Sequence, residues 1–331
     1  MPHALQRAWL RRGPVACLLW PLSLLFGALA AARRLAYRSR VLRTERLPVP
    51  VIVVGNVIAG GSGKTPIVIA LIQHLRGRGI DAGVITRGYG RVTDDCREVL
   101  ADSAPLEVGD EPLLVARASG APVFVAVQRA EAGRALLAAR PHTQVIVCDD
   151  GLQHQALERD VEICVFDERG VGNGWLLPAG PLREAWPKPV DLVLQSGDPA
   201  GVTGFGVGRK LGSLARRSDG QEIALELLTD RPLTALAGIA KPEVFFAMLR
   251  DRGLRLERTL ALPDHHDFSL PVPGTEGSEL VCTEKDAVKL WRIRPDAWSV
   301  ALKLEIDPRF WVAFDRLVDA KLSSAHGSQT S

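Results

Sequence analysis

The sequence predicts an α/β fold: a core with a mostly parallel sheet, a smaller C-terminal α/β lobe and an N-terminal membrane-associated helix. The apolar run at residues 51–55 leads through a glycine-rich turn into a helix-like segment, as a strand, a phosphate loop and a helix do. Short apolar runs then alternate with amphipathic segments, the pattern of a parallel sheet covered by helices. Residues 14–32 carry no charge and are long enough to enter a bilayer.

The composition is that of a globular α/β protein in a reducing compartment. The chain has 331 residues, of which 47% are apolar, 24% charged and 5% aromatic, which suits two domains or one large domain with attachments. The five cysteines are widely spaced and include no CxxC pair. They therefore predict buried thiols, with neither a disulfide framework nor a structural zinc site.

Positive charge is concentrated at the N-terminus. Residues 1–46 carry nine arginines and one glutamate, a net charge of +8, so the rest of a chain with a total of +3 carries −5. The body also lacks interleaved basic and aromatic residues. This distribution argues against a DNA- or RNA-binding face, and no nucleic acid partner is expected.

Residues 51–65, VIVVGNVIAGGSGKT, form the most specific motif. Glycines let backbone N–H groups approach phosphate oxygens, and the helix that follows directs the positive end of its dipole at them. Ile58 stands where the strict pattern has a glycine, which indicates a variant loop. An ordinary glycine-rich turn is the alternative, but GGSGKT after a strand is much rarer than GxGxxG. The predicted phosphate-binding residues are Gly60, Gly61, Ser62, Gly63, Lys64 and Thr65, with Lys64 at the β and γ phosphates and the Thr65 hydroxyl on Mg²⁺.

A second motif completes a nucleoside triphosphatase pattern. The apolar run at residues 145–148 ends in Asp149 and Asp150, where a carboxylate would hold Mg²⁺ directly or through water. Gln153 follows within reach of the same sheet edge and is a further metal candidate. A strand-end turn also uses Asp-Gly often, but the combination with GGSGKT favours the metal role. The core is therefore predicted to be of the P-loop NTPase type, with a nucleoside triphosphate and Mg²⁺ as its ligands.

Two other segments are expected at the carboxyl edge of the sheet, where ligands collect. Arg87 and Tyr89 follow the apolar strand at residues 82–86 and are candidates to hold a phosphate or a sugar, although an ordinary turn explains them equally well. Asp110 and Glu111 stand just ahead of an apolar helix. Acidic residues occur there for capping reasons alone, so catalysis is one of two interpretations.

The uncharged segment at residues 14–32 could be a cleaved signal peptide, a membrane-spanning helix, a helix lying in the membrane interface or a buried core helix. A signal peptide would export the phosphate loop away from ATP, and arginines stand where its cleavage site should lie. Trp20, Pro21 and the short length favour a tilted or partly embedded membrane anchor, with spanning and interfacial positions both left open. The arginines that follow keep the body cytoplasmic.

The α/β pattern restarts at Arg231 in a smaller unit. Its segment DHHDF at residues 264–268 could hold a metal, but adjacent side chains point apart, so a single acid/base histidine is favoured. Residues 169–184 predict a fixed irregular loop and residues 197–212 a boundary, because both are rich in glycine. The predicted divisions are a membrane helix with a basic collar (1–46), a phosphate-loop core (47–230), a smaller lobe (231–320) and a disordered tail (321–331).

With these motifs identified, the chain resembles the tetraacyldisaccharide 4′-kinases of lipid A assembly over nearly its whole length. The matching segments keep the family's order: GNVIAGGSGKTP, TRGYGR, VGDEP, DDGLQH, RGVGNGWLLPAGPLRE, LAGIAKPEVFF, PDHHDF and CTEKDA. The resemblance implies transfer of the ATP γ-phosphate to the 4′-hydroxyl of a tetraacyldisaccharide 1-phosphate, giving lipid IVA. It also implies the inner membrane as the location, with the body on the cytoplasmic face and a lipid disaccharide as substrate. We expect a monomer.

The resemblance also implies roles for single residues. Asp110 matches the family's catalytic acidic residue, and Lys64 would serve both phosphate binding and catalysis. The partner histidine matches His265, although the motif alone does not separate it from His266. The metal would be surrounded by Thr65, Glu111, Asp149, Asp150 and Gln153, and the acceptor by Arg87 and Tyr89.

Two alternatives from other classes use the same features. A membrane-tethered nucleotide switch or metal-insertion GTPase would read guanine with an Asn-Lys-x-Asp motif, for which TEKD at residues 283–286 is the nearest stretch and out of register. A non-catalytic membrane scaffold would have no need of an intact Lys64, Thr65, Asp110 and Asp149. Both explain less of the chain than the kinase does.

Overall fold

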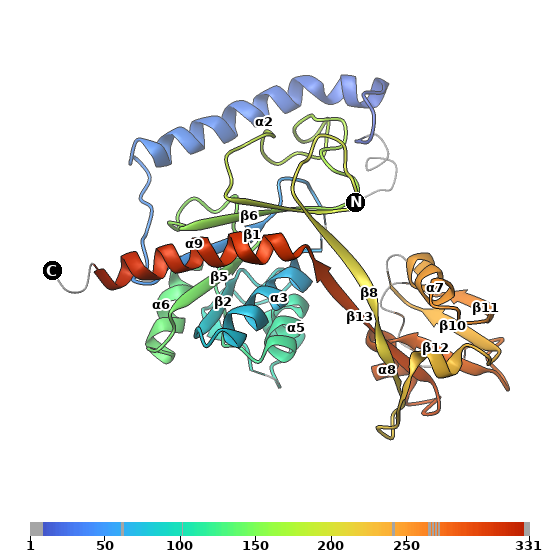
Figure 1. The fold of residues 1–331 in the computed structure, drawn as a ribbon. Helices are drawn as coiled ribbons and strands as arrows, with labels where there is room; N and C mark the ends of the chain where they lie inside the picture. Colours follow the sequence, from blue (N-terminus) through green and yellow to red (C-terminus); the bar gives the residue numbers. More distant parts are fainter. Residues whose placement is uncertain are drawn as a thin grey trace. The chain divides into compact units, whose positions relative to one another are not determined.

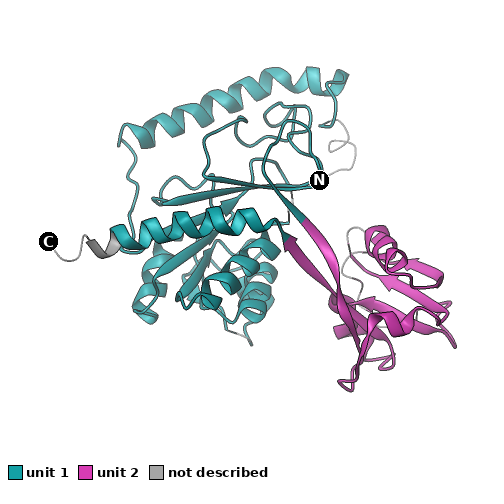
Figure 2. Cartoon of the chain, in the orientation of Figure 1, with its two compact units in different colours: residues 1–207, 306–331 teal, residues 208–305 magenta. Residues whose placement is uncertain are grey.

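The computed structural model describes residues 9–60, 63–100, 102–239, 242–263, 266, 268, 270 and 272–327, with residues 325–327 as backbone only. The chain divides into two compact units, Met1–Val207 with Ile306–Ser331, and Gly208–Glu305 (Figure 2). This division differs from the expected boundaries at residues 231 and 320. Strands β8 (Phe205–Arg216) and β13 (Trp298–Ile306) each pass from one unit to the other, so the smaller unit begins and ends earlier than its motifs suggested.

The first unit is built on a mostly parallel sheet, as predicted. Its strand β1 (Val51–Gly55) lies between β5 (Val145–Asp149) and β6 (Val161–Phe166) (Figure 1). Both β1 and β5 are buried along their whole length, because helices cover the faces of a parallel sheet and its strands must be continuously apolar. Further out are β2 (Ala82–Thr86), β4 (Val123–Val125), β7 (Leu192–Ser196) and the short antiparallel β3 (Arg97–Glu98).

Helices pack against this sheet and set where each loop begins. The helices are α3 (Lys64–Gly77), α5 (Asp110–Ser119) and α6 (Arg129–Ala139), with the single turn α4 (Pro105–Val108) ahead of α5. In α3 the buried residues recur at helical spacing: Ile67, Val68, Leu71, Ile72 and Leu75. This apolar face holds α3 on the sheet and fixes its first turn directly after the phosphate loop.

The C-terminal helix α9 (Pro308–Gly327) belongs to the first unit and corrects two expectations. Phe310 and Phe314 are fully buried. Asp315 Oδ1 lies 2.8 Å from His74 Nε2 and accepts from Arg78 Nη1 at 2.8 Å, which ties α9 to α3. The helix is therefore part of the core and not of the smaller lobe. It continues through residues 321–327, where a disordered tail was expected, and residues 328–331 lie outside the described residues.

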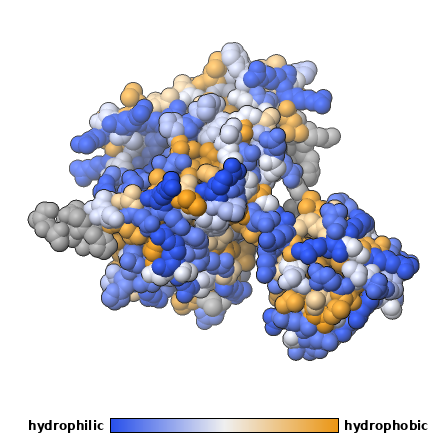
Figure 3. Space-filling model, viewed as in Figure 1, coloured by the Kyte–Doolittle hydropathy of each residue, from blue (hydrophilic) through white to orange (hydrophobic). Residues whose placement is uncertain are grey.

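The apolar N-terminal segment forms α2 (Pro14–Arg38), which is longer than the uncharged run and includes three of the arginines that follow it. The helix is long and apolar enough to cross a membrane. Only Ala16 and Ser23 are buried in it, whereas Leu18 is 80% exposed, so a buried core helix is excluded. In the space-filling view, hydrophilic side chains gather at both ends of this helix (Figure 3).

One side of α2 rests on the loop at residues 173–182. Ser23 Oγ donates to Leu176 O at 2.8 Å and accepts from Ala179 N at 2.9 Å. The Trp20 and Trp175 rings lie 6.3 Å apart, centroid to centroid. The glycine- and proline-rich loop is thus an ordered, irregular surface, as predicted. The N-terminal helix packs against it.

Replacing Ser23 by Ala is expected to lower the free energy of unfolding by about 1–3 kcal/mol, because a buried carbonyl and a buried N–H lose their partner. Chemical denaturation in detergent measures this loss. Cys17→Ala, at an exposed position of the same helix, serves as the control and should change stability by less than about 0.5 kcal/mol. Equal losses in the two variants would mean that the Ser23 hydrogen bonds do not hold the helix in place.

The second unit is a smaller α/β unit, as expected. Its parallel strands follow the order β11 (Leu256–Ala261), β10 (Leu233–Ala237), β12 (Glu279–Thr283) and β13, with helices α7 (Pro242–Asp251) and α8 (Glu284–Leu290) and the short 3₁₀ turn η1 (Leu225–Leu228). Beside β13 lies β8, which pairs antiparallel with β9 (Glu222–Ala224). The glycine-rich stretch at residues 197–212 contains the first division between the two units, as predicted. Its second half is also strand, which the glycines hide because they interrupt the side-chain alternation that signals a strand.

Candidate functional site

The phosphate loop joins the buried strand β1 to helix α3. Gly60 and Gly63 have φ values of 98° and 73°, which glycine adopts without steric cost. Gly63 directly precedes α3, and no side chain caps that end of the helix. The first N–H groups of α3 are therefore available to an anion. Two other predicted phosphate ligands, Gly61 and Ser62, lie outside the described residues.

Lys64 opens α3, with Thr65 after it, and its side chain is only 12% exposed. The Nζ atom lies 3.3 Å from Asp150 Oδ1, and Arg183 Nη1 lies 3.5 Å from Oδ2 of the same carboxylate. The Asp150 carbonyl accepts from Arg129 Nη2 at 2.7 Å. Three cations from three separate segments therefore hold Asp150 at the end of β5, where its φ is 49°.

Asp149 is the last residue of β5 and only 3% exposed. Burial raises the pKa of its carboxyl to about 7; Lys64 lowers that pKa, whereas Glu111 and Asp150 raise it. Its Oδ1 is buried and has no hydrogen-bond partner, which fits a divalent cation as a ligand. Within the described ranges no three His, Cys, Asp or Glu side chains are grouped to hold a metal, so Mg²⁺ here would need phosphate or hydroxyl oxygens as well.

Asp110 and Glu111 form the first turn of α5, and both are exposed. The helix dipole stabilises negative charge at this end. Gly109, just ahead of them, has φ 94°, and a Cβ on it would lie 3.1 Å from the carbonyl oxygen of Tyr89. The close approach brings the loop after β2 against the start of α5. Asp110 and the candidate acceptor loop therefore share one edge of the sheet.

Arg87 and Tyr89 stand on that loop, and Tyr89 is 89% exposed. With Arg91, Asp94 and Val127 they line a cavity of about 250 Å³. Among the described residues, no acidic side chain forms an ion pair with Arg87. The guanidinium and the phenol are thus free to contact a ligand.

Gln153 connects two segments of the site by hydrogen bonds. Its Nε2 donates to Asn56 O and to Glu184 Oε1, both at 2.9 Å, and so links the end of β1 to the long loop. Lys188 Nζ donates to the other oxygen of Glu184 at 3.0 Å. Only the Oε1 atom of Gln153 is left for a cation, so its contacts favour a positioning contribution.

The predicted catalytic histidine, His265, lies outside the described residues. Its neighbour His266 is described. His266 Nδ1 accepts from Phe268 N at 3.1 Å, which engages the ring within its own turn. The His266 carbonyl accepts from Lys289 Nζ at 3.1 Å, which connects the backbone to helix α8.

Arg129, Arg183 and His154 belong to the site although their motifs predicted no role for them. The two arginines contact Asp150, and His154 lies near several arginine side chains. Burial lowers the pKa of His154 to about 4, with further lowering by Arg129, Arg159, Arg33 and Arg87. His154 is therefore neutral at neutral pH and reports a positive potential. No local pattern predicts this cluster, because its members come from α2, α6 and separate loops.

The fold and the site together define a P-loop nucleotide-binding protein equipped for phosphoryl transfer. The family model described as Tetraacyldisaccharide-1-P 4′-kinase matches residues 15–322. The chain belongs to this family, which confirms the resemblance seen in its motifs. The membership also favours the kinase over the nucleotide switch and the scaffold.

Named relatives and one solved structure agree with the family. The tetraacyldisaccharide 4′-kinase of Acidovorax sp. (strain JS42) is 60% identical over 98% of this chain and 97% of the relative. That of Polaromonas sp. (strain JS666 / ATCC BAA-500) is 54% identical over 98% and 100%. The crystal structure of LpxK from Aquifex aeolicus in complex with ATP is 28% identical, covers 93% of this chain and 99% of its own, and has a TM-score of 0.72.

Proposed function

We propose that this chain transfers the γ-phosphate of ATP to the 4′-hydroxyl of tetraacyldisaccharide 1-phosphate and so makes lipid IVA. The family and its named members support the reaction, and the ATP in the solved LpxK complex supports the donor. The observation in this chain that carries the proposal is Lys64 held beside Asp149 and Asp150 at the end of the phosphate loop. Phosphoryl transfer needs this combination of a cation and metal-binding carboxylates.

The phosphate loop binds the donor through backbone N–H groups of Gly60, Gly61, Ser62 and Gly63. Lys64 contacts the β and γ phosphates and gives up its contact with Asp150 to do so. Arg183 then keeps the Asp150 carboxylate paired. Lys64 neutralises charge on the transferred phosphoryl group, which lowers the barrier.

We infer Mg²⁺ as the metal cofactor. The Thr65 hydroxyl and Asp149 would hold it, with Asp150, Glu111 and Gln153 around it. Bound there, Mg²⁺ supplies charge neutralisation at the β and γ phosphate oxygens. The unpartnered buried oxygen of Asp149 supports this assignment.

Asp110 accepts the proton of the 4′-hydroxyl. As it does so, the 4′-oxygen of the sugar forms a bond to the γ-phosphorus, and the bond between the γ-phosphorus and the departing ADP oxygen breaks. The side chain of Asp110 is exposed in the first turn of α5, where an acceptor hydroxyl can reach it. Arg87 and Tyr89, from the loop that packs on Gly109, orient the acceptor sugar.

We propose that His265, and not His266, is the catalytic histidine, because His266 Nδ1 already accepts from Phe268 N within its own turn. The variant His265→Ala is expected to lower kcat about 100-fold with the Kd for ATP within about twofold of wild type. His266→Ala should lower kcat less than about tenfold. Steady-state kinetics with a separate nucleotide-binding measurement checks both. A larger loss in the His266 variant would reverse the assignment.

Helix α2 anchors the enzyme at the inner membrane, with the body on the cytoplasmic face. The exposed apolar side of the helix and the arginines that follow it support this location. An acyl-chain substrate stays in the bilayer, so an anchored enzyme searches for it in two dimensions.

The proposed function is tested by transfer of label from γ-labelled ATP to purified tetraacyldisaccharide 1-phosphate in detergent, with Lys64→Ala as the blank. A labelled lipid made by the wild type and not by the blank is expected. No labelled lipid, together with tighter binding of GTP than of ATP, would replace the kinase by a nucleotide switch.

A further inference from the structure

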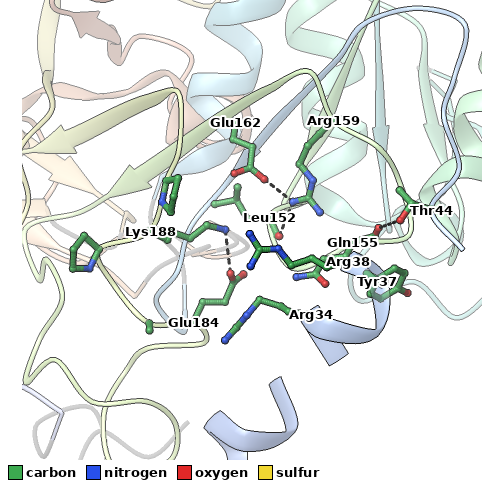
Figure 4. A pocket seen from close by; sticks show the side chains of 13 residues that line it. Arg34, Tyr37, Arg38, Thr44, Leu152, Gln155, Arg159, Glu162, Glu184 and Lys188 are labelled. Carbon is green, nitrogen blue, oxygen red and sulfur yellow. Dashed lines mark hydrogen bonds and ion pairs between the residues drawn. The ribbon is translucent and has the colours of Figure 1, made fainter. Parts of the chain in front are cut away.

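A second, larger pocket lies apart from the residues proposed for phosphoryl transfer. It has a volume of about 640 Å³ and is walled on one side by the C-terminal part of α2 (Figure 4). Arg34, Tyr37 and Arg38 enter it from α2, and Arg159 and Lys188 enter it from the core. None of its lining residues is a proposed phosphate-loop, metal or acceptor residue. The pocket therefore has no assigned ligand.

Positive charge exceeds negative charge in this pocket. Its four cations, Arg34, Arg38, Arg159 and Lys188, face two carboxylates, Glu162 and Glu184. Both carboxylates are already engaged: Arg159 Nη1 donates to Glu162 at 2.8 Å, and Lys188 Nζ to Glu184 at 3.0 Å. Across the described part of the chain, no acidic side chain forms an ion pair with Arg34 or Arg38. Two guanidinium groups are left uncompensated.

The arrangement of these groups favours a bound anion. Arg34 and Arg38 are one helical turn apart on α2, where like charges repel unless an anion lies between them. Guanidinium groups bind phosphate oxygens in bidentate fashion. Gln155 also lines the pocket, and its Oε1 is buried without a hydrogen-bond partner. The Gln155 Oε1 atom can accept a hydrogen bond from a hydroxyl or an amide N–H that the ligand carries next to its anionic group.

The position of the pocket beside α2 suits a lipid phosphate. Arg34 and Arg38 follow the apolar part of α2, so a membrane-embedded helix holds them at the level of the headgroups. A phosphate on a sugar or on glycerol combines the anion with the hydroxyl or amide groups that the lining can bind.

We propose that this pocket binds a non-reacting phosphate ester of a membrane lipid: the 1-phosphate of the disaccharide substrate or the phosphodiester of a bilayer phospholipid. The first source rests on the kinase function proposed above. The pocket adjoins the transfer site through its wall, because Glu184 accepts from Gln153 and the preceding Arg183 pairs with Asp150. A lipid whose phosphate binds in the pocket is thus positioned next to the phosphate loop.

The test compares wild type, Arg34→Ala/Arg38→Ala and a charge-matched control, Arg11→Ala/Arg43→Ala, whose exposed arginines do not line the pocket. One arm measures KM in neutral detergent for the disaccharide substrate with and without its 1-phosphate. The other arm measures KM in phosphatidylcholine vesicles with and without phosphatidylglycerol. The Kd for ATP and the thermal unfolding midpoint report whether each variant is folded.

If the ligand is the substrate 1-phosphate, wild type and control favour the phosphorylated lipid by about tenfold in KM, and the pocket variant loses that preference. If the ligand is a phospholipid, phosphatidylglycerol lowers KM for wild type and control but not for the pocket variant. The inference is overturned if the pocket variant keeps both responses, or if the control loses them equally. Failure of the kinase function itself is separate, because the wild type would then make no lipid product.

Discussion

Replacing Asp110 by Asn lowers kcat by about 10³-fold and leaves the Kd for ATP within about twofold of the wild-type value. The amide keeps the size and the helix N-terminal position of the side chain but cannot accept the proton of the 4′-hydroxyl. Single-turnover transfer from labelled ATP, with nucleotide binding measured separately, distinguishes the two effects.

The matched control is Glu107→Gln, an exposed acidic residue of the preceding turn α4 that pairs with Arg97. It should retain kcat within about twofold, because an exposed ion pair contributes little. If the Asp110 variant instead loses ATP affinity in proportion to its rate, Asp110 is a nucleotide or metal ligand and its assignment as base is wrong.

Asp149→Asn is expected to lower kcat/KM by at least about 10²-fold while raising the stability of the metal-free enzyme. The activity falls because a neutral amide is a poor ligand for Mg²⁺. The stability rises because the wild-type carboxylate is buried and has one oxygen without a partner. A loss of activity together with a gain of stability would indicate that Asp149 contributes to function at the expense of stability.

The direction of the stability change follows from the pKa of Asp149, which is about 7 in the folded protein against an ordinary 3.8. Between those values the folded state binds more protons than the unfolded chain, so the stability that this group contributes is present at low pH and lost as the pH rises through 7. The loss is at most about 4 kcal/mol. The asparagine variant avoids it, and its melting temperature at pH 8 should exceed that of wild type by roughly 5 °C.

Thermal unfolding in a chelator at pH 6 and pH 8 measures this difference, which should be larger at pH 8. Asp81→Asn, at an exposed position before β2, is the control and should move the midpoint little at either pH. Adding Mg²⁺ and nucleotide should stabilise the wild type more than the Asp149 variant. A chelated Asp149 variant less stable than wild type at pH 8 would show that the carboxylate supports the fold itself.

The elements nearest the phosphate loop could be predicted closely from the sequence. The strands at residues 51–55 and 82–86 have the bounds that their patterns indicated. Both signals are local, since each strand is a short run of apolar residues that ends at a turn. Strand β8 and helix α9 were not predicted, because glycines hide the first and the second takes its place in the core through partners more than 200 residues away in the sequence.

The site divides in the same way. Lys64, Thr65, Asp149 and Asp150 follow from two motifs, because phosphate and metal binding require these residue types at fixed spacing. The cluster around Asp150 does not follow, since Arg129 and Arg183 come from α6 and a loop with no pattern of their own. The assignment of Asp110 as base and of His265 as its partner stays a prediction.

By itself, the sequence determined the phosphate-loop motif, the apolar N-terminal helix and the family, and it predicted the carboxylates that we propose to bind metal. Each of these depends on residue type and spacing along a short stretch. The tertiary structure alone decided which cations hold Asp150 and where the second unit ends. It also decided that Arg34 and Arg38 of α2 share a pocket with Arg159 and Lys188 of the core. Such groupings depend on distances between segments remote in the chain, which packing sets and no local pattern encodes.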